Sequence, residues 1–423
     1  MDRLVIRGGK RLEGTVEVSG AKNAALPILA ATLLTKEKSV IQNVPQVADV
    51  VTMVKILKGL GAKVHHGGGF VEVDPSEIES PVLTYKLVST MRGSICFLGP
   101  CLARFGKAQV SFPGGCVIGP RPIDLHLKGV RLLGADVSLD HGYVIARAKK
   151  LKGGRIYLGG AYGSSVLGTA NVMMAATLAK GRTIIDNAAC EPEVVDLGNF
   201  LKVMGAKIEG LGSPSIEIEG VESLRGATHS IIPDRIEAGT YMIAAAITKG
   251  DVTVKNVNLR MLAALLDKLR EAGVSVTEKN GTARVRRQGN LKPISVTTLP
   301  YPGYPTDLQA QMMALMCVVP GISVITEKIY PERFMHVSEL NRMGAGIMLE
   351  GPSAIVSGKK ALSGAPVMAS DLRASAALVL AGLVAEGSTE VSRVYHLDRG
   401  YENLVAKLGG LGATIRREKE IRQ

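Results

Sequence analysis

The chain has 423 residues, of which 46% are hydrophobic and 21% charged. This length predicts two or three domains, and the composition excludes a disordered chain. Lys and Arg exceed Asp and Glu by 13, so the surface or a cleft should attract anions. Because aromatic residues make up only 4%, platforms for stacking bases are scarce, and we expect a small phosphorylated ligand rather than nucleic acid.

The first residues, MDRLVIRGGK, lack the apolar stretch and cleavage site of a signal peptide. No apolar run reaches the roughly 18 residues that span a bilayer. We therefore expect a cytoplasmic protein with no membrane partner. The five cysteines (96, 101, 116, 190 and 317) are odd in number and lack CxxC spacing, so we expect neither disulfides nor a metal site.

One pattern recurs six times along the chain, as LKGLGAKV, VRLLGADV, LKVMGAKI, LDKLREAGVSV, LNRMGAGI and LGGLGATI. Its glycines, 68 to 73 residues apart, are Gly61, Gly134, Gly205, Gly273, Gly344 and Gly412. Each copy predicts the end of an amphipathic helix, closed by a left-handed glycine and followed by a strand. Most copies follow a strand opened by glycine, such as GRTIIDNAA or GDVTVKNVN. Six such repeats fill the chain and must pack together to bury their sheets.

The predicted strand-to-helix loops carry most of the candidate functional groups. A carboxylate in such a loop can simply be stabilised by the positive N-terminal end of the helix dipole. An arginine is repelled by that end unless an anion lies between the arginine and the helix. The fourth loop offers only Arg260. The residues of the other loops are Asp49, Cys116, Arg121, Glu191, Glu193, Arg333, Asp398 and Arg399.

The segment SFPGGCVIGPRPIDLH, residues 111–126, places a thiol in a loop of glycines and prolines. Cys116 gains nothing there as a core residue, and the nearby Arg121 would lower its pKa. The sequence by itself leaves two interpretations open, a reactive thiol or a free thiol on a flexible loop.

Several longer motifs indicate a family. SGAKNAALPILAATLL, TMRGSICFLGP, FPGGCVIGPRPIDLHL, PDRIEAGTYM, YPTDLQAQMMAL, RFMHVSEL and DLRASAALVLAGL closely resemble the UDP-N-acetylglucosamine 1-carboxyvinyltransferase family, also called UDP-N-acetylglucosamine enolpyruvyltransferases. The resemblance covers essentially the whole chain. It implies an α/β (α+β) fold, a two-domain inside-out α/β barrel built from six repeats of about 70 residues. One domain would be 22–231, with the cysteine loop, the other 1–21 plus 232–423, and the active site would lie in the cleft between them.

The resemblance also implies a reaction. The enolpyruvyl group of phosphoenolpyruvate would be transferred to the 3-hydroxyl of UDP-N-acetylglucosamine by addition and elimination, with release of phosphate. This is the first committed step of peptidoglycan precursor synthesis. The two substrates are the expected partners, and no cofactor or metal is expected. The oligomeric state cannot be inferred from the sequence.

The reaction needs an acid over the methylene carbon, a base near the hydroxyl, and cations for the phosphate and carboxylate. The resemblance assigns Cys116 an acid or product-release role and Asp307 that of candidate base. Lys22 would act with Asn23, Arg121 and Arg399 to hold phosphoenolpyruvate. From the residues alone, Asn23 and either Thr306 or Asp307 would be interpreted as helix caps.

Further matching positions imply substrate contacts. Those expected to contact the nucleotide sugar are Arg92, Pro122, Ile123, Asp124, Leu125, His126, Ser164, Ser165, Val166 and Ile329. Those expected to line the cleft are Glu191, Glu193, Asp234, Arg235, Thr306, Arg333, Asp371 and Arg373. Without the resemblance, His126 would be structural, and His336 is expected to pack. The stretch 159–168 is about three residues longer than the common pattern and has Gly163 where one branch of the family has lysine.

Two other functions remain open from the sequence. The sister transferase that uses shikimate 3-phosphate shares fold and donor, but it lacks the loop cysteine and has an NAGTxxR signature that is not found here. A non-catalytic anion-binding or RNA-binding repeat protein would have no need for Cys116 or Asp307. A related RNA-cyclase-like enzyme would need a histidine nucleophile, which no motif highlights.

Overall fold

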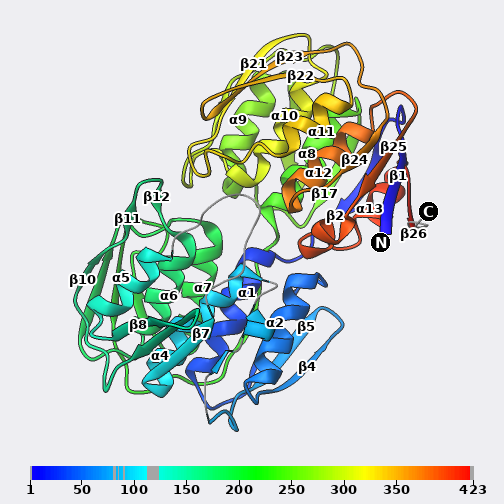
Figure 1. Cartoon of the computed structure of the whole chain (residues 1–423). Coiled ribbons are helices and arrows are strands. Elements are labelled where there is room, and N and C mark those ends of the chain that lie inside the picture. The colour runs from blue at the N-terminus through cyan, green and yellow to red at the C-terminus, as the bar shows by residue number, and fades with distance from the viewer. Residues whose placement is uncertain (1, 80–81, 84, 89–90, 112–122, 420–423) are drawn as a thin grey trace. The chain divides into compact units, whose positions relative to one another are not determined.

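The computed structural model describes residues 2–79, 82–83, 85–88, 91–111 and 123–419. They form two units (Figure 1). Unit 1 holds the residues up to Ser19 and those from Pro233 onward, and unit 2 holds the residues from Gly20 to Ile232. No helix in the described ranges is long and apolar enough to cross a membrane.

Each unit has three four-stranded sheets of one design among its described residues. In each sheet an edge strand runs parallel to its neighbour, and the other two strands continue antiparallel. The sheets of unit 2 are β16 (Thr228–Ser230), β3 (Ser39–Gln42), β5 (Phe70–Asp74) and β4 (Lys63–Gly67); β6 (Val82–Leu83), β7 (Lys107–Ser111), β9 (Tyr143–Arg147) and β8 (Asp136–Asp140); and β10 (Arg155–Tyr157), β13 (Arg182–Asp186), β15 (Ser215–Glu219) and β14 (Lys207–Glu209). A short hairpin joins β11 (Gly159–Gly160) to β12 (Gly163–Ser164).

The sheets of unit 1 repeat this design with strands from both ends of the chain. They are β2 (Glu13–Glu17), β17 (Asp251–Lys255), β19 (Thr282–Arg287) and β18 (Val274–Lys279); β20 (Val296–Thr297), β21 (Gly321–Thr326), β23 (Ser353–Gly358) and β22 (Gly346–Glu350); and β24 (Pro366–Met368), β25 (Ser388–Ser392), β1 (Asp2–Arg7) and β26 (Thr414–Lys419). Because β1 lies between β25 and β26, the first residues of the chain complete its last repeat.

Every repeat has one inner and one outer helix. The inner helices are α1 (Lys22–Ala31), α4 (Leu98–Phe105), α6 (Val166–Ala176), α8 (Arg235–Ile247), α10 (Gln309–Met316) and α12 (Leu372–Gly382). The outer helices are α2 (Ala48–Gly59), α5 (Asp124–Leu132), α7 (Pro192–Val203), α9 (Ala263–Glu271), α11 (His336–Arg342) and α13 (Leu404–Gly410). Shorter helical turns are α3 (Tyr85–Val88), η1 (Thr32–Leu34), η2 (Arg92–Phe97), η3 (Leu259–Leu262), η4 (Thr306–Leu308) and η5 (Val394–Arg399).

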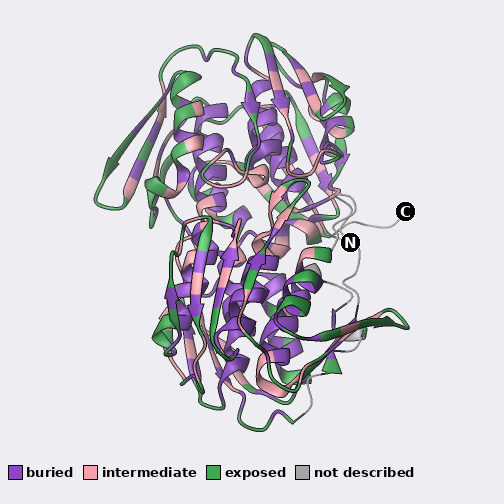
Figure 2. Ribbon diagram, turned by 90° about the vertical axis from the view of Figure 1, so that its left-hand side faces the viewer, coloured by how far each residue is buried: buried purple, intermediate pink, exposed green. Residues whose placement is uncertain are grey.

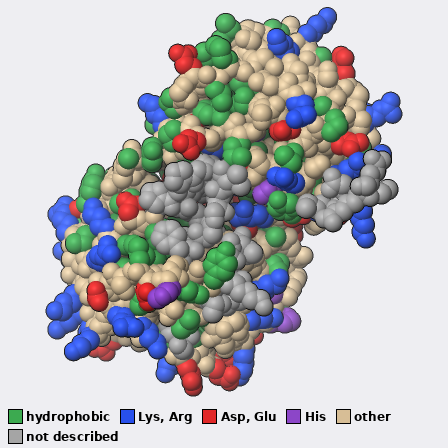
Figure 3. All heavy atoms as spheres, in the orientation of Figure 1, with side chains coloured by type: hydrophobic (Ala, Val, Ile, Leu, Met, Phe, Trp, Pro, Cys, Tyr) green, Lys and Arg blue, Asp and Glu red, His purple; other side chains and the backbone are tan. Residues whose placement is uncertain are grey.

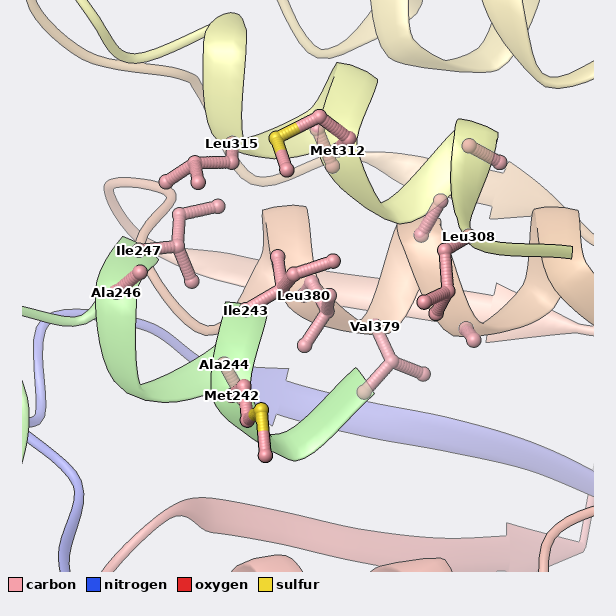
Figure 4. Close-up of a cluster of buried hydrophobic side chains, with 14 of the residues drawn as sticks. Met242, Ile243, Ala244, Ala246, Ile247, Leu308, Met312, Leu315, Val379 and Leu380 are labelled. Carbon is pink, nitrogen blue, oxygen red and sulfur yellow. The ribbon is translucent and has the colours of Figure 1, made fainter. Parts of the chain in front are cut away.

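The inner helices are buried on nearly all sides because their sequences are apolar on nearly all sides. All eight residues of α10 are buried, as are ten of the eleven in α12. Within each unit these helices form the buried interior and the strands lie outside them (Figure 2). Ile243, Met312 and Leu380 show how α8, α10 and α12 share one apolar core (Figure 4). The expected inside-out arrangement is therefore confirmed.

The six repeat glycines all have positive φ angles, from 87° at Gly344 to 109° at Gly205. Each follows an outer helix and precedes a strand, as the sequence predicts. Residues with a Cβ are strained in this conformation, whereas glycine adopts it freely. The helix-end interpretation of the repeat is therefore confirmed at all six positions.

Gly412→Ala and Gly409→Ala form a matched test of this interpretation at the end of α13. Gly412 has a φ of 96°, whereas Gly409 lies within the helix, and an added Cβ meets nothing within 4 Å. We expect Gly412→Ala to lower the free energy of unfolding by about 1 kcal/mol. Gly409→Ala should raise it by up to about 1 kcal/mol. Urea denaturation measures both, and shifts of the same sign would contradict the interpretation.

Candidate functional site

The inner helices of unit 1 pack on one another, and their N-terminal ends carry many of the predicted site residues. Asp234 caps α8 by accepting N–H groups of Ile236 and Glu237 at 2.8 and 3.0 Å. Asp371 caps α12 in the same way, through the N–H groups of the second and third residues after it, at 2.9 and 3.1 Å. These two carboxylates therefore hold helix ends in place, in addition to any contact with substrate.

Asp307 lies between two buried arginines. Its Oδ1 accepts from Arg333 Nη1 and its Oδ2 from Arg373 Nη2, both at 2.9 Å. The arginines are 5% and 2% exposed, whereas a quarter of the Asp307 side chain (25%) is exposed. Asp307 is thus an anionic partner that both arginines share. Asp307 does not cap a helix, because Pro305 occupies the cap position of η4, so the capping interpretation is wrong for this residue.

The charge on Asp307 is fixed by these neighbours. Burial disfavours the charge, but the guanidinium groups of Arg373 and Arg333 outweigh burial and hold the pKa of Asp307 well below its usual range. The carboxyl group is therefore ionised at neutral pH. It can accept a hydrogen bond from a hydroxyl group, but it is a weak base while both arginines hold it.

Arg373 has a second layer of support that the sequence reasoning missed. Its guanidinium carbon lies 5.4 Å from the centre of the Tyr401 ring, and Tyr401 Oη lies 2.9 Å from Thr240 Oγ1 and 3.2 Å from Gln311 Nε2. Arg373 Nη1 is buried and has no hydrogen-bond partner in the described part of the chain. A buried donor of this kind is available to a ligand.

Glu327 is the clearest residue that the sequence analysis missed. It is fully buried, and its carboxylate accepts hydrogen bonds from Thr298 Oγ1 and Thr306 Oγ1 at 2.7 and 2.8 Å. It also accepts the N–H groups of Ile329 and Tyr330 at 2.8 and 3.0 Å. Thr306 in turn accepts from Arg333 at 2.9 Å. Glu327 thus links the loop of Ile329 to the Asp307 cluster.

The remaining candidates of unit 1 differ in position. Arg235 lies at the start of α8, 5.5 Å from the centre of the Tyr301 ring, and Arg399 is half-buried in η5. Asp398 makes an ion pair with Arg417 at 2.6 Å, and Arg260 is exposed on η3. The structure thus places Asp398 in a surface pair and does not bring Arg260 into the Asp307 cluster.

In unit 2 the first residue of α1 is Lys22, which is 8% exposed. Its Nζ lies 3.0 Å from Asp49 Oδ2 at the start of α2. Asn23 lies inside α1, whose cap position is Ala21, with no side-chain capping bond. The interpretation of Asn23 as a helix cap is therefore wrong, because the helix begins two residues earlier than that interpretation requires.

His126 belongs to a buried hydrogen-bond network at the centre of unit 2. Its Nδ1 lies 2.8 Å from Asn171 Nδ2, which also donates to Ile95 O at 2.9 Å. Asn171 Oδ1 accepts from Gly99 N at 2.7 Å. Since the amide donates to Nδ1, the proton of a neutral His126 lies on Nε2. This bond gives His126 a structural role, as its apolar helix face predicts, and the contact with the nucleotide sugar that the resemblance implies stays a prediction.

The stretch that departs from the family pattern forms the β11–β12 hairpin. Gly163 has a φ of 96°, which a lysine would adopt only with strain. Ser164 lies in β12, and Ser165 caps α6, just before Val166, by accepting from Gly168 N at 3.1 Å. Glycine at position 163 thus suits the tight turn of this hairpin.

The other predicted residues of unit 2 are in part described. Ile123 is buried, Asp124 begins α5 and is exposed, and Leu125 is half-buried. Glu191 occupies the cap position of α7, and Glu193 is buried in its first turn. Arg92 begins η2. Cys116, Arg121 and Pro122 lie outside the described residues.

The described thiols differ from a catalytic one. Burial raises the pKa of Cys96, Cys101 and Cys317 to about 12, so these groups stay protonated. Burial also raises the pKa of Cys190. None of these four is suited to act as a nucleophile. The described residues contain no group of three or more His, Cys, Asp or Glu residues that could hold a metal ion.

Glu327→Gln tests how the buried carboxylate holds the Asp307 cluster. The Glu327 carboxylate accepts hydrogen bonds on both of its oxygens, whereas the glutamine amide has only one oxygen that can accept. We therefore expect the free energy of unfolding to fall by about 1 to 3 kcal/mol. Glu332→Gln is the control, because Glu332 is exposed in the same loop, and it should change stability by less than about 0.5 kcal/mol. Chemical denaturation gives both values. Equal losses in the two variants would rule out this role of Glu327.

His336 predicts a pH dependence of stability. It is buried as expected, and burial lowers its pKa to about 4. Above pH 6.5 both the folded and the unfolded chain hold it neutral; as pH falls towards 4, only the unfolded chain binds a proton, so stability falls. From pH 7 to pH 5 the wild type should lose about 2 kcal/mol more than His336→Gln. Denaturation at both pH values measures this, and an equal loss in the two proteins would contradict it.

Comparison with known proteins identifies the family. The sequence profile described as EPSP synthase (3-phosphoshikimate 1-carboxyvinyltransferase) matches residues 6–408. The UDP-N-acetylglucosamine 1-carboxyvinyltransferase of Geotalea uraniireducens is 56% identical over 420 residues, which are 99% of this chain and 100% of that one. The protein of the same name from Myxococcus xanthus is 56% identical over 422 residues, with the same coverage.

Solved structures agree with this relationship. The enolpyruvyl transferase NikO from Streptomyces tendae superposes with a TM-score of 0.90 at 27% identity, over 99% of both chains. An EPSP synthase from Acinetobacter baumannii gives a TM-score of 0.76 at 18% identity, over 99% of this chain and 100% of that one, and shares the fold. The predicted fold class is therefore confirmed, and the chain belongs to the UDP-N-acetylglucosamine 1-carboxyvinyltransferase family of the enolpyruvyl transferases.

Proposed function

We propose that the chain transfers the enolpyruvyl group of phosphoenolpyruvate to the 3-hydroxyl of UDP-N-acetylglucosamine and releases phosphate. The observation that carries this proposal is a contrast in identity. Relatives named for the UDP-N-acetylglucosamine reaction are 54 to 56% identical over at least 99% of their length, whereas the EPSP synthase structures are 17 or 18% identical. The product would enter peptidoglycan precursor synthesis, and because both substrates are cytoplasmic metabolites we place the reaction in the cytoplasm.

The reaction proceeds by addition and then elimination. In the addition, the methylene carbon of phosphoenolpyruvate gains a proton while the sugar hydroxyl attacks the neighbouring carbon and loses its proton to a base. In the elimination, the methyl carbon loses a proton and the phosphate leaves, which restores the double bond. The protein must therefore supply an acid, a base and a set of cations.

We assign to Asp307 the contact with the attacking 3-hydroxyl of the sugar. Its carboxylate is ionised and partly exposed, which suits it to orient a hydroxyl group and to receive the proton as attack proceeds. The two arginines lower its basicity, so proton transfer is expected to accompany protonation of the double bond rather than to precede it. Arg333 and Arg373 thereby fix the direction of the carboxylate.

We assign the phosphoenolpyruvate site to Lys22, Asn23, Arg121 and Arg399, and the acid to Cys116. These roles follow from the resemblance of the motifs. Arginine forks suit phosphate and carboxylate groups, and an ammonium group adds a point charge. The ion pair of Lys22 with Asp49 holds its ammonium group at the start of α1. We further propose that the two units form one cleft, which closes over both substrates and excludes water.

The nucleotide sugar is expected to contact Arg92, Pro122, Ile123, Asp124, Leu125, His126, Ser164, Ser165, Val166 and Ile329. Ile329 illustrates how the structure supports a backbone role. Its N–H group is bound to Glu327 at 2.8 Å, so the course of the backbone at Ile329 is fixed whatever its side chain.

Phosphate release from phosphoenolpyruvate tests the proposal. We expect turnover with UDP-N-acetylglucosamine and none above background with shikimate 3-phosphate. In Cys116→Ala, turnover should fall by about 10²-fold or more, as expected for loss of a general acid. Cys190→Ala should keep wild-type turnover. Activity with only the shikimate acceptor would refute the proposal, and full activity of Cys116→Ala would remove Cys116 as the acid.

Asp307→Asn tests the proposed base, with Asp267→Asn as the control, since Asp267 is exposed on α9. We expect the kcat of Asp307→Asn to fall by about 10²- to 10⁴-fold. The kcat of Asp267→Asn should stay within about twofold of the wild type. Steady-state kinetics with both substrates saturating gives the comparison. A similar kcat in both variants would show that Asp307 takes no part in the reaction.

A further inference from the structure

Unit 2 contains a cavity of about 1210 Å³ that the proposed function does not use. All three of its repeats contribute to the walls, through segments that follow the C-terminal ends of the inner helices. Thr35 follows η1, Phe105 ends α4, and Leu178 follows α6. Lys22 and Ser165, by contrast, lie at the N-terminal ends of α1 and α6. Since α1 and η1 together span about 20 Å, the cavity is a separate site.

Cations outnumber carboxylates around this cavity. Lys36, Lys107, Arg147, Lys149 and Lys150 are exposed there, and none of them has an ion pair among the described residues. The carboxylates on the walls are those of Glu37, Asp136 and Glu222. Lys and Arg side chains gather on the side of unit 2 where β8 and β10 lie (Figure 3). The cavity therefore has a net positive charge that no protein group neutralises.

Two of these cations face each other across neighbouring strands. Lys107 of β7 is the direct partner of Arg147 of β9 in the antiparallel register. Like charges at directly opposed positions destabilise a sheet unless a counter-charge lies between them. Asp136 is the partner of Arg147 on the other side, but among the described residues its carboxylate forms no ion pair. The pair is thus a ready site for an anion.

Arg104 shows that a cation here can have a structural role instead. Its Nη1 donates to the carbonyl oxygens of Leu33 and Thr35 at 3.1 and 2.7 Å, and its Nη2 donates to Pro75 O at 2.9 Å. It therefore caps the end of α1 and η1, where a cation favours the helix dipole. The five exposed cations make no such bonds, so capping does not explain them.

The cavity also has an apolar lining. Ala103, Phe105, Ala148 and Leu178 line it and are half-buried, so part of their apolar surface is accessible. A purely inorganic anion would leave these side chains unused. The combination of apolar walls with a cationic rim is typical of sites for phosphorylated organic molecules.

We propose that this cavity binds a phosphorylated organic anion, with its phosphates on Lys107, Arg147, Lys149 and Lys150 and its organic part on the half-buried side chains of Phe105 and Leu178. The site goes beyond the proposed function, because it shares no residue with it. The ligands that fit this description share a polyphosphate group. A nucleoside triphosphate represents polyphosphates with an organic part, and inorganic triphosphate represents those without one.

Isothermal titration calorimetry of the full chain with ATP and with inorganic triphosphate tests the proposal. We expect ATP to bind more tightly than triphosphate, and we expect the double variant Lys107→Glu, Lys150→Glu to weaken ATP binding at least about tenfold. The double variant Lys55→Glu, Lys202→Glu is the control. It makes the same change in net charge on exposed residues of unit 2 that do not line the cavity. Circular dichroism checks that all variants fold.

The outcomes are separable. A loss confined to the cavity variant supports the proposal. An equal loss in the control variant would show that only overall charge attracts the ligand, and no binding by the wild type would remove the site. Equal affinity for ATP and triphosphate would refute the role of Phe105 and Leu178. None of these results depends on enolpyruvyl transfer, so failure here leaves the proposed function untouched.

Discussion

The organisation of unit 1 depends on one buried interaction, the carboxylate of Asp307 between Arg333 and Arg373. Two guanidinium groups this deeply buried near helix N-termini would repel each other and the helix dipoles. Asp307 offsets that repulsion, and its own pKa is held low in return. Glu327 then fixes Thr306 and the Ile329 backbone around the same group. A cluster of this kind is pre-organised, so a hydroxyl group meets a carboxylate whose charge and direction are already set.

The fold explains why such groups collect where they do. Because each inner helix is apolar on nearly all sides, the interior of a repeat has no room for charge. Charged side chains are therefore confined to the helix ends, and three inner helices that pack together bring three such ends into one place. The N-terminal ends in unit 1 carry the Asp307 cluster, and the C-terminal ends in unit 2 border the basic cavity. One architectural constraint thus creates two chemically different sites.

The sequence predicts the repeated, local features of this structure well and the tertiary contacts poorly. The six glycines have left-handed φ angles because that requirement is local. His336 and the apolar helices are buried as their sequence context indicates. The cap interpretation of Asn23 is wrong because the helix start depends on the preceding turn, and Asp307 is bound by arginines 26 and 66 residues away. Asn171 and Tyr401 were missed because their partners lie in other repeats. Glu327 was missed because its two threonine partners, although in its own repeat, lie 29 and 21 residues away along the chain.

The ionisation of Asp307 is the most direct test of the account. A ¹³C NMR pH titration of the full chain with labelled aspartate, with the signal assigned by Asp307→Asn, reports the carboxyl group itself. The account predicts that this signal stays at its ionised position down to pH 3.8, the ordinary aspartate value. A titration with its midpoint at or above pH 3.8 would show that the two arginines do not control the carboxylate, and would contradict the central claim.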